Sequence, residues 1–116
     1  MIPQIRPAAF GSWLLSQADA RPLVLDVREP WETSLAHVKP LVDAPGFDVL
    51  LMPMQSIPQR LAELPPDRPM ACLCHHGIRS QQVAAFLQSR GFESVVNIAG
   101  GIEAWSRELD TSVANY

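Results

Sequence analysis

One segment of the chain, residues 72–80 (CLCHHGIRS), brings two cysteines, two histidines and an arginine together. It begins inside an apolar run of strand length and ends where a helix-like pattern begins. In open parallel sheets, ligands bind outside the carboxyl ends of the strands, in the loops that lead to the following helices. The segment therefore has both the residue types and the position of a reactive loop.

A loop of this kind cradles an anion. Successive backbone N–H groups point inward, and the following helix adds the positive end of its dipole, so a cysteine at the rim is stabilised as the nucleophilic thiolate. Cys74 stands at that position, and we expect it to be the nucleophile. The residues after it, which include a glycine for the tight backbone and a fixed positive charge, are the expected substrate-binding residues: His75, His76, Gly77, Ile78 and Arg79.

The two cysteines have different expected roles. A free cysteine is most often a small buried hydrophobic residue, and this remains the alternative for Cys74. For Cys72, inside the apolar run, we prefer that structural role, with a resolving thiol as the alternative. Side chains two apart in an extended segment lie ~6.6 Å apart, against ~3.8 Å in a disulfide, so we expect no bridge between them.

The two adjacent histidines raise the question of a metal site. They could bind a metal together with Cys72 and Cys74, but zinc sites normally combine two neighbouring ligands with two more at a distance. The only other histidine is His37. We therefore expect no metal, and we interpret His75 and His76 as exposed loop side chains that influence substrate entry. Arg79 has two compatible interpretations, binding of an anion and pairing with a carboxylate.

The composition is that of one folded domain, residues 1–116. The 47% hydrophobic and 18% charged residues fit neither a disordered chain nor a membrane span. The net charge is -3, the basic residues are scattered and Lys39 is the only lysine, so we expect neither nucleic acid nor a membrane as a partner. The N-terminus shows no secretory signal, which predicts a cytoplasmic protein.

Apolar runs alternate with helical patterns along the chain. Four segments have apolar residues at helical spacing and are predicted helices. One begins at Pro7, one after Ser56 as a candidate N-cap, one runs from Ser80 to Arg90, and the last follows Gly100–Gly101. Runs that are apolar on both sides suit strands buried between two layers. The alternation predicts an α/β fold with a mainly parallel central sheet flanked by helices on both faces. The four runs are 23–25, 49–52, 70–73 and 95–98.

Three segments in order along the chain carry a family resemblance. They are residues 26–32 (DVREPWE) with His37 after them, residues 74–80 (CHHGIRS), and Gly91–Phe92 followed by 96–105 (VNIAGGIEAW). They resemble the first signature segment, the active-site loop and the closing segment of the rhodanese family. The resemblance runs nearly end to end.

The resemblance implies a doubly wound α/β domain with sulfurtransferase activity. Its loop cysteine, here Cys74, would accept a sulfane sulfur as a persulfide and pass it to a nucleophile. A small donor such as thiosulfate and an acceptor such as cyanide, a thiol or a protein are implied as partners, and no cofactor is implied. Asp26, Arg28 and Glu29 would be chiefly structural.

The chain departs from the family pattern at one place. The family usually passes quickly from its histidine, through a proline-glycine turn, to the next strand, whereas residues 39–48 lengthen that connection here. We interpret this segment as an insertion that leaves the loop chemistry intact. Such a loop would reach the site or serve as a docking surface.

Two other functions remain open. Cysteine phosphatases and arsenate reductases use a similar cradle, but the phosphatase loop has five residues between cysteine and arginine, whereas four separate Cys74 from Arg79. The smaller loop is less able to surround a phosphoryl group. The third interpretation is a binding module of the same fold, without catalysis or with sulfur relay to one partner, and the presence of Cys74 argues against lost catalysis.

Overall fold

A five-stranded sheet lies at the centre of the part of the chain that the computed structural model describes, residues 1–41 and 44–116. Neighbouring strands pair in parallel, in the order β1-β5-β4-β2-β3. Parallel strands require crossover connections, which the helices between them supply. The strands are β1 (Gln4–Ile5), β2 (Leu23–Asp26), β3 (Asp48–Leu51), β4 (Met70–Leu73) and β5 (Val95–Ile98).

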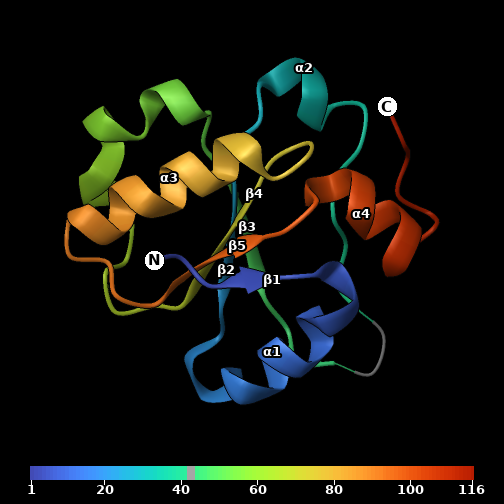
Figure 1. The fold of residues 1–116 in the computed structure, drawn as a ribbon, viewed down its shortest axis with the longest axis horizontal. Coiled ribbons are helices and arrows are strands. Elements are labelled where there is room, and N and C mark those ends of the chain that lie inside the picture. The colour runs from blue at the N-terminus through green and yellow to red at the C-terminus, as the bar shows by residue number, and fades with distance from the viewer. Residues whose placement is uncertain (42–43) are drawn as a thin grey trace.

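Helices cover both faces of the sheet, as Figure 1 shows for α3 and α1. On one face lie α3 (Ile78–Ser89) and the 3₁₀ helices η3 (Met54–Ser56) and η4 (Pro58–Glu63), and on the other lie α1 (Phe10–Ser16) and α4 (Gly101–Glu108). The predicted α/β class with helices on both faces is confirmed. Among the described residues, none of the helices has the length and hydropathy that spanning a bilayer needs. The remaining short helices are η1 (Pro7–Ala9), η2 (Ala18–Ala20) and α2 (Pro30–Thr33).

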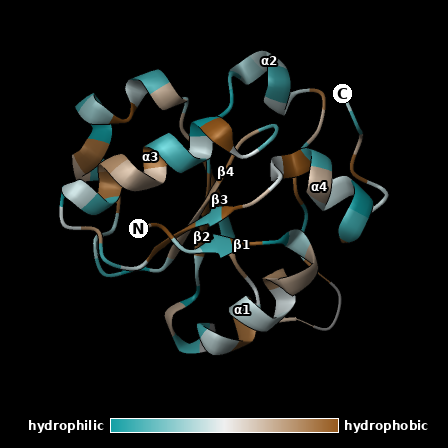
Figure 2. Ribbon diagram, in the orientation of Figure 1, coloured by the Kyte–Doolittle hydropathy of each residue, from teal (hydrophilic) through white to brown (hydrophobic). Residues whose placement is uncertain are grey.

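The central strands read as continuous apolar runs because both of their faces are buried. Successive strand residues point to opposite faces. Leu25 and Cys72 join the core under α3, whereas Val24 and Ala71 join the core under α1 and α4. Figure 2 shows that α3 and α4 each mix hydrophobic and hydrophilic residues. Val83 and Leu87 of α3 and Trp105 of α4 face these cores.

The sequence prediction was wrong at both edges of the sheet. The short strand β1 was not predicted, because two residues carry too little pattern. The run 49–52 was predicted to be buried on both sides, but β3 is an edge strand, and Val49 and Leu51 are 40% and 51% exposed. An edge strand has only one neighbour, so part of its apolar surface stays uncovered.

Two helix starts also differ from the prediction. Ser56 is not an N-cap but the last residue of η3, and its hydroxyl donates to the carbonyl of Pro53. Pro58 has no N–H to continue a regular helix from η3, so this region forms short 3₁₀ helices. The helix predicted from Ser80 begins at Ile78 instead.

The described part of the insertion 39–48 packs on the side of the sheet that carries α1. Phe47 is buried, and its ring meets that of Phe10 edge-on with the centroids 5.4 Å apart. Leu41 packs against the same core, and residues 42–43 lie outside the described residues. The described part of the insertion therefore contributes to the core, and its predicted role in docking stays a prediction.

Candidate active site

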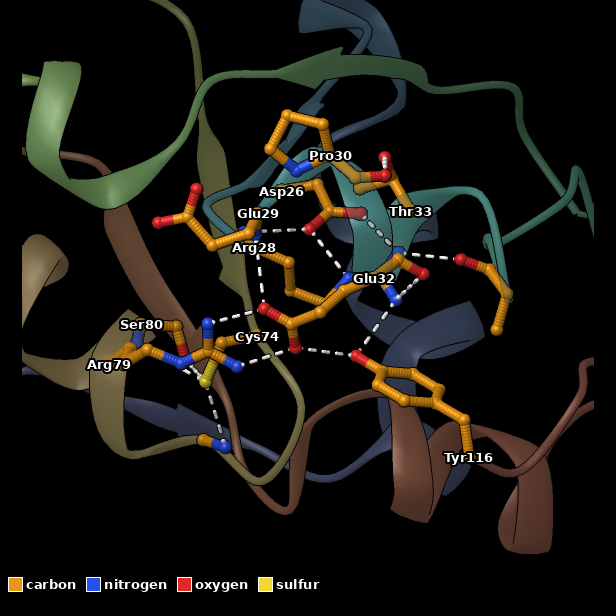
Figure 3. A network of polar contacts seen from close by, with 12 residues as sticks. Asp26, Arg28, Glu29, Pro30, Glu32, Thr33, Cys74, Arg79, Ser80 and Tyr116 are labelled. Carbon is orange, nitrogen blue, oxygen red and sulfur yellow. Dashed lines mark hydrogen bonds and ion pairs between the residues drawn. The ribbon is translucent and has the colours of Figure 1, made fainter.

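The loop after β4 folds around the sulfur of Cys74 (Figure 3). The residue directly follows the carboxyl end of β4 and is only 1% exposed. The backbone N–H groups of Gly77 and Ser80 donate to its Sγ at 3.1 and 3.3 Å. Ser80 lies in the first turn of α3, so the positive end of this helix faces the sulfur. The expectation that loop amides point at the cysteine is confirmed for these two groups.

Two glycines allow the loop to close. Gly77 has φ 100°, in the left-handed region that favours glycine, immediately before α3. Gly101 has φ 62°, and a Cβ there would lie 2.3 Å from the carbonyl oxygen of His75. This close approach lets the N–H of Ile102 donate to the carbonyl of Cys74 at 2.9 Å. Carbonyls of the loop thus face α4, while amides face the sulfur.

A buried polar chain connects the loop to β5 and β1. The Ser80 hydroxyl accepts from the Cys74 thiol at 3.3 Å and donates to Asn97 Oδ1 at 2.5 Å. The Asn97 Nδ2 group donates to the carbonyl of Gly77 at 3.1 Å and to Gln4 Oε1 at 2.8 Å. One asparagine in β5 therefore holds both ends of the turn that leads into α3.

Arg79 forms a two-pronged ion pair with Glu32 of α2 (Figure 3). Its two terminal nitrogens donate to the two carboxylate oxygens at 2.7 and 2.8 Å. These bonds are the main reason that the pKa of Glu32 is lowered to about 2, and they raise the pKa of Arg79. Pairing with a carboxylate, one of the two roles left open for Arg79, is therefore present, and the side chain is still 35% exposed.

A second ion pair, fully buried, is linked to the first. Arg28 donates through Nε and Nη2 to the carboxylate of Asp26 at 2.9 and 2.7 Å, and both side chains are buried. Tyr116 joins the two pairs, because its hydroxyl accepts from Arg28 at 3.1 Å and donates to Glu32 at 2.8 Å. This arrangement fits the structural role that the resemblance implied for Asp26 and Arg28.

The two histidines differ in their surroundings. His76 is 57% exposed and pairs with Glu103 at 2.5 Å. His75 was expected to be exposed, but it is partly buried, because its ring stacks on Tyr116 and on His76 with centroids 4.1 and 3.9 Å away. Burial, aided by His76, lowers the pKa of His75. Together with Ile78, His76 is thus an exposed side chain of the loop.

Cys72 lies inside β4 and is fully buried. Neither cysteine is in a disulfide, as expected from their spacing. Burial raises the pKa of Cys72 to about 12, so its thiol stays protonated at neutral pH. These properties favour the structural role predicted for Cys72.

Comparison of the sequence with known proteins agrees with this fold. Residues 11–108 match the model of the rhodanese-like domain. The chain belongs to the rhodanese family. A sulfurtransferase of Allochromatium vinosum is 38% identical over 107 residues, which cover 92% of this chain and 91% of that protein. The thiosulfate sulfurtransferase GlpE of Vibrio cholerae is 36% identical over 84 residues, 72% of each protein.

Solved structures share the rhodanese fold over the same length. A rhodanese-related protein of Thermoplasma volcanium superposes with a TM-score of 0.72 at 28% identity, and the match covers 92% of this chain and 93% of that one.

A longer relative was also found by sequence. A chloroplast rhodanese-like/PpiC domain protein of Arabidopsis thaliana is 41% identical over 97 residues, but this chain spans only 30% of its length. The sulfurtransferase relatives support sulfur transfer in general.

Three residues around the rhodanese loop have contacts that sequence reasoning missed. Glu32 was part of a recognised segment but received no role, although it follows β2, which pairs with β4 and ends at the same edge of the sheet. Its position was therefore a usable signal. The same signal was available for Glu103, which lies in a recognised segment and follows β5, the other neighbour of β4. Tyr116 gave no such signal, because no local pattern links it to the loop.

Proposed function

We propose that this rhodanese is a sulfurtransferase that carries sulfane sulfur as a persulfide on Cys74. The donor is a small anion such as thiosulfate, and the acceptor is a thiol, cyanide or a protein nucleophile. The observation that carries the proposal is the pair of hydrogen bonds that the backbone N–H groups of Gly77 and Ser80 donate to the Cys74 sulfur, at 3.1 and 3.3 Å. Preorganised donors of this kind stabilise negative charge without having to reorient during the reaction.

The reaction proceeds in two displacements. The Cys74 thiolate attacks the outer sulfur of thiosulfate, a new S–S bond forms, and the old one breaks as sulfite leaves with the electron pair. The acceptor then attacks the outer sulfur of the persulfide. With cyanide, thiocyanate leaves and the thiolate is restored, so no external oxidant or reductant is consumed. The two amides and the start of α3 stabilise the thiolate before and after each cycle.

The donor is a dianion, and the loop offers groups that suit it. Arg79 is partly exposed, and the ion pair with Glu32 engages two of its N–H groups. A guanidinium has five N–H groups, so others are left for an oxyanion. In this proposal His75, His76, Gly77 and Ile78 surround the donor, with His76 and Ile78 at the exposed entrance.

Intact mass measurement after incubation with thiosulfate tests the proposal. We expect one added sulfur, removable with dithiothreitol, in the wild type and in Cys72→Ser. Cys74→Ser should show none and should lose thiosulfate-to-cyanide transfer, because it lacks the sulfur-carrying thiol. Thermal melts of the three proteins check that the fold is kept.

Two results would contradict this assignment. Equal loss of sulfur loading in Cys72→Ser and Cys74→Ser would mean that the carrier is not Cys74 alone. Hydrolysis of p-nitrophenyl phosphate that depends on Cys74, without sulfur loading, would show phosphatase chemistry instead. The four-residue spacing between Cys74 and Arg79 is the reason that we expect no such hydrolysis.

A further inference from the structure

Three side chains from two separate parts of the fold meet beside the loop. His75 and His76 follow Cys74, and Glu103 lies in the first turn of α4. One ring nitrogen of each histidine and one carboxylate oxygen of Glu103 all lie within 4.8 Å of one another. The backbone holds this arrangement in place, because the N–H of Glu103 donates to the carbonyl of His75 at 3.2 Å.

The Nε2 atom of His75 needs a partner. It is buried and makes no hydrogen bond within residues 1–41 and 44–116, although the backbone of Tyr116 lies near the ring. A buried polar atom without a partner is unfavourable, and native structures contain few of them. The His75 ring stacks on Tyr116, so its orientation does not depend on a bond at this nitrogen or on the position of His76. A cation bound at this nitrogen would satisfy it.

The other two side chains leave a route for an ion. His76 is 57% exposed, and its contact with Glu103 is a direct one between ring nitrogen and carboxylate. Arg107 also approaches Glu103, but at 3.5 Å and with its own side chain largely exposed. An exposed ion pair of this kind is weak, so it does not hold the carboxylate away from a metal.

The spacing is close to that of a zinc site. Ligand atoms at ~2.0 to 2.2 Å from a tetrahedral zinc ion lie ~3.3 Å from one another. The present separations, within 4.8 Å, require movements of about an ångström or more. Rotation of the more exposed side chains, His76 and Glu103, supplies them.

We propose that His75, His76 and Glu103 form a binding site for a zinc-like transition-metal ion, distinct from the thiol of Cys74. Two imidazoles and one carboxylate suit zinc, whereas calcium and magnesium prefer oxygen ligands. Three protein ligands leave the fourth tetrahedral position open for water or another small ligand. The sequence argued against a metal because its candidate ligands all lie close together in the chain and no distant pair was visible, whereas α4 supplies a distant carboxylate.

Calorimetric titration of the full chain with Zn²⁺ tests the site. We expect one ion per chain in the wild type. Loss of a residue that only supports a metal ligand typically lowers metal affinity ~10- to 100-fold. Loss of a ligand itself should cost at least as much, so Glu103→Gln and His76→Ala should each weaken Zn²⁺ binding by at least that factor. His37→Ala is the matched histidine control and should keep the wild-type affinity.

A second arm separates this site from zinc binding by thiolate. Cys74→Ser should still bind one Zn²⁺, and its Co²⁺ form should show d–d absorption without a thiolate-to-cobalt charge-transfer band. Absence of saturable binding, unchanged affinity in both Glu103→Gln and His76→Ala, or loss of binding in Cys74→Ser would each overturn the proposal. Thermal melts confirm that the variants are folded. No sulfur donor is present, so the result is independent of the sulfurtransferase proposal.

Discussion

At Arg79, one guanidinium has to serve both the loop and an anionic substrate. Glu32 is only 3% exposed, so its charge depends on the ion pair with Arg79 and on the hydroxyl of Tyr116. A buried carboxylate that loses its cation is strongly destabilising. A single substitution of Arg79 therefore changes both stability and substrate binding, and a useful experiment has to separate the two.

We predict that Arg79→Ala lowers kcat/KM for thiosulfate by ~30- to 1000-fold, equivalent to ~2 to 4 kcal/mol, because the dianion loses a donor. Arg79→Lys should fall between this variant and the wild type, since it keeps the charge but not the forked geometry. Transfer from preformed persulfide to cyanide should suffer less, because sulfite has already left. Separate measurement of the two half-reactions checks this.

The double variant Arg79→Ala/Glu32→Gln is the control for stability. It removes the unpaired buried charge, so its melting temperature should exceed that of Arg79→Ala, while its thiosulfate step stays slow. If both half-reactions fall equally in Arg79→Ala and both recover in the double variant, Arg79 only holds the loop.

Glu32 should also make the free energy of unfolding depend on pH in the acidic range. Its folded pKa of about 2 lies below the ordinary value of 4.5. Its contribution is therefore present above pH ~4.5 and is lost as the pH falls toward 2, amounting to about 3 kcal/mol in all. We predict that the stability advantage of the wild type over Glu32→Gln shrinks by about 2 kcal/mol between pH 5 and pH 3. Urea unfolding at the two pH values measures it.

A matched control comes from Glu63, which pairs with Arg60 on the surface. Glu63→Gln should show little change across the same pH range, because water screens an exposed pair. A difference between wild type and Glu32→Gln that does not vary with pH would show that Glu32 is not held ionised by Arg79.

At the scale of elements, the contact between α4 and the loop shapes the cradle. The first turn of α4 donates to the carbonyls of Cys74 and His75 through Ile102 and Glu103. These bonds turn the carbonyls away from the sulfur, so that the amides of the same loop are free to face it. The geometry depends on Gly101, where the two backbones meet.

We predict that Gly101→Ala destabilises the protein by at least ~1 kcal/mol more than Gly91→Ala and abolishes sulfur loading. Both glycines have positive φ, 62° and 92°, so both alanines carry strain of ~1 to 3 kcal/mol. The Cβ at Gly101 meets backbone atoms, whereas in the described part of the chain nothing lies within 4 Å of a Cβ at Gly91. Urea unfolding and intact mass after thiosulfate measure the two effects. Equal behaviour of the variants would mean that the loop adjusts freely to α4.

At the scale of the whole molecule, Arg28 links parts of the chain that are far apart. It bonds to Asp26 at the end of β2, to the carbonyl of Ala36 at 2.8 Å and to the hydroxyl of Tyr116 at 3.1 Å. The segment around α2, the central sheet and the last described residue thus converge on one buried guanidinium. The Tyr116 hydroxyl in turn donates to Glu32, which pairs with Arg79 of the loop.

We predict that Arg28→Met lowers the free energy of unfolding by ~3 to 5 kcal/mol, because Asp26 is left buried without its partner. Asp26→Leu/Arg28→Met replaces both charges with apolar side chains and should be less destabilised than Arg28→Met alone. Urea unfolding of the two single variants and the double variant forms the required cycle. Additive losses would show that the pair does not interact energetically.

The sequence alone was sufficient for the α/β class, for four of the strands and for the loop of Cys74. These features depend on near neighbours. A strand covered on both faces is apolar along nearly its whole length, as in β2 and β4. Gly77 has a positive φ, a backbone conformation that other residues rarely adopt. At the edges the reasoning was incomplete: β1 is too short to carry a pattern, and β3 was predicted as a strand but wrongly as buried on both faces.

Only the tertiary structure decided the partners of the loop side chains. Arg79 meets Glu32 across 47 residues, and Tyr116 reaches Glu32 across 84. The carboxylate beside His75 and His76 comes from α4, on the other side of α3 and β5 in the chain. Such pairings follow from which elements pack side by side, and a local pattern of residue types does not contain that information. The residues of the loop were therefore readable from the sequence, whereas their charges and partners required the fold.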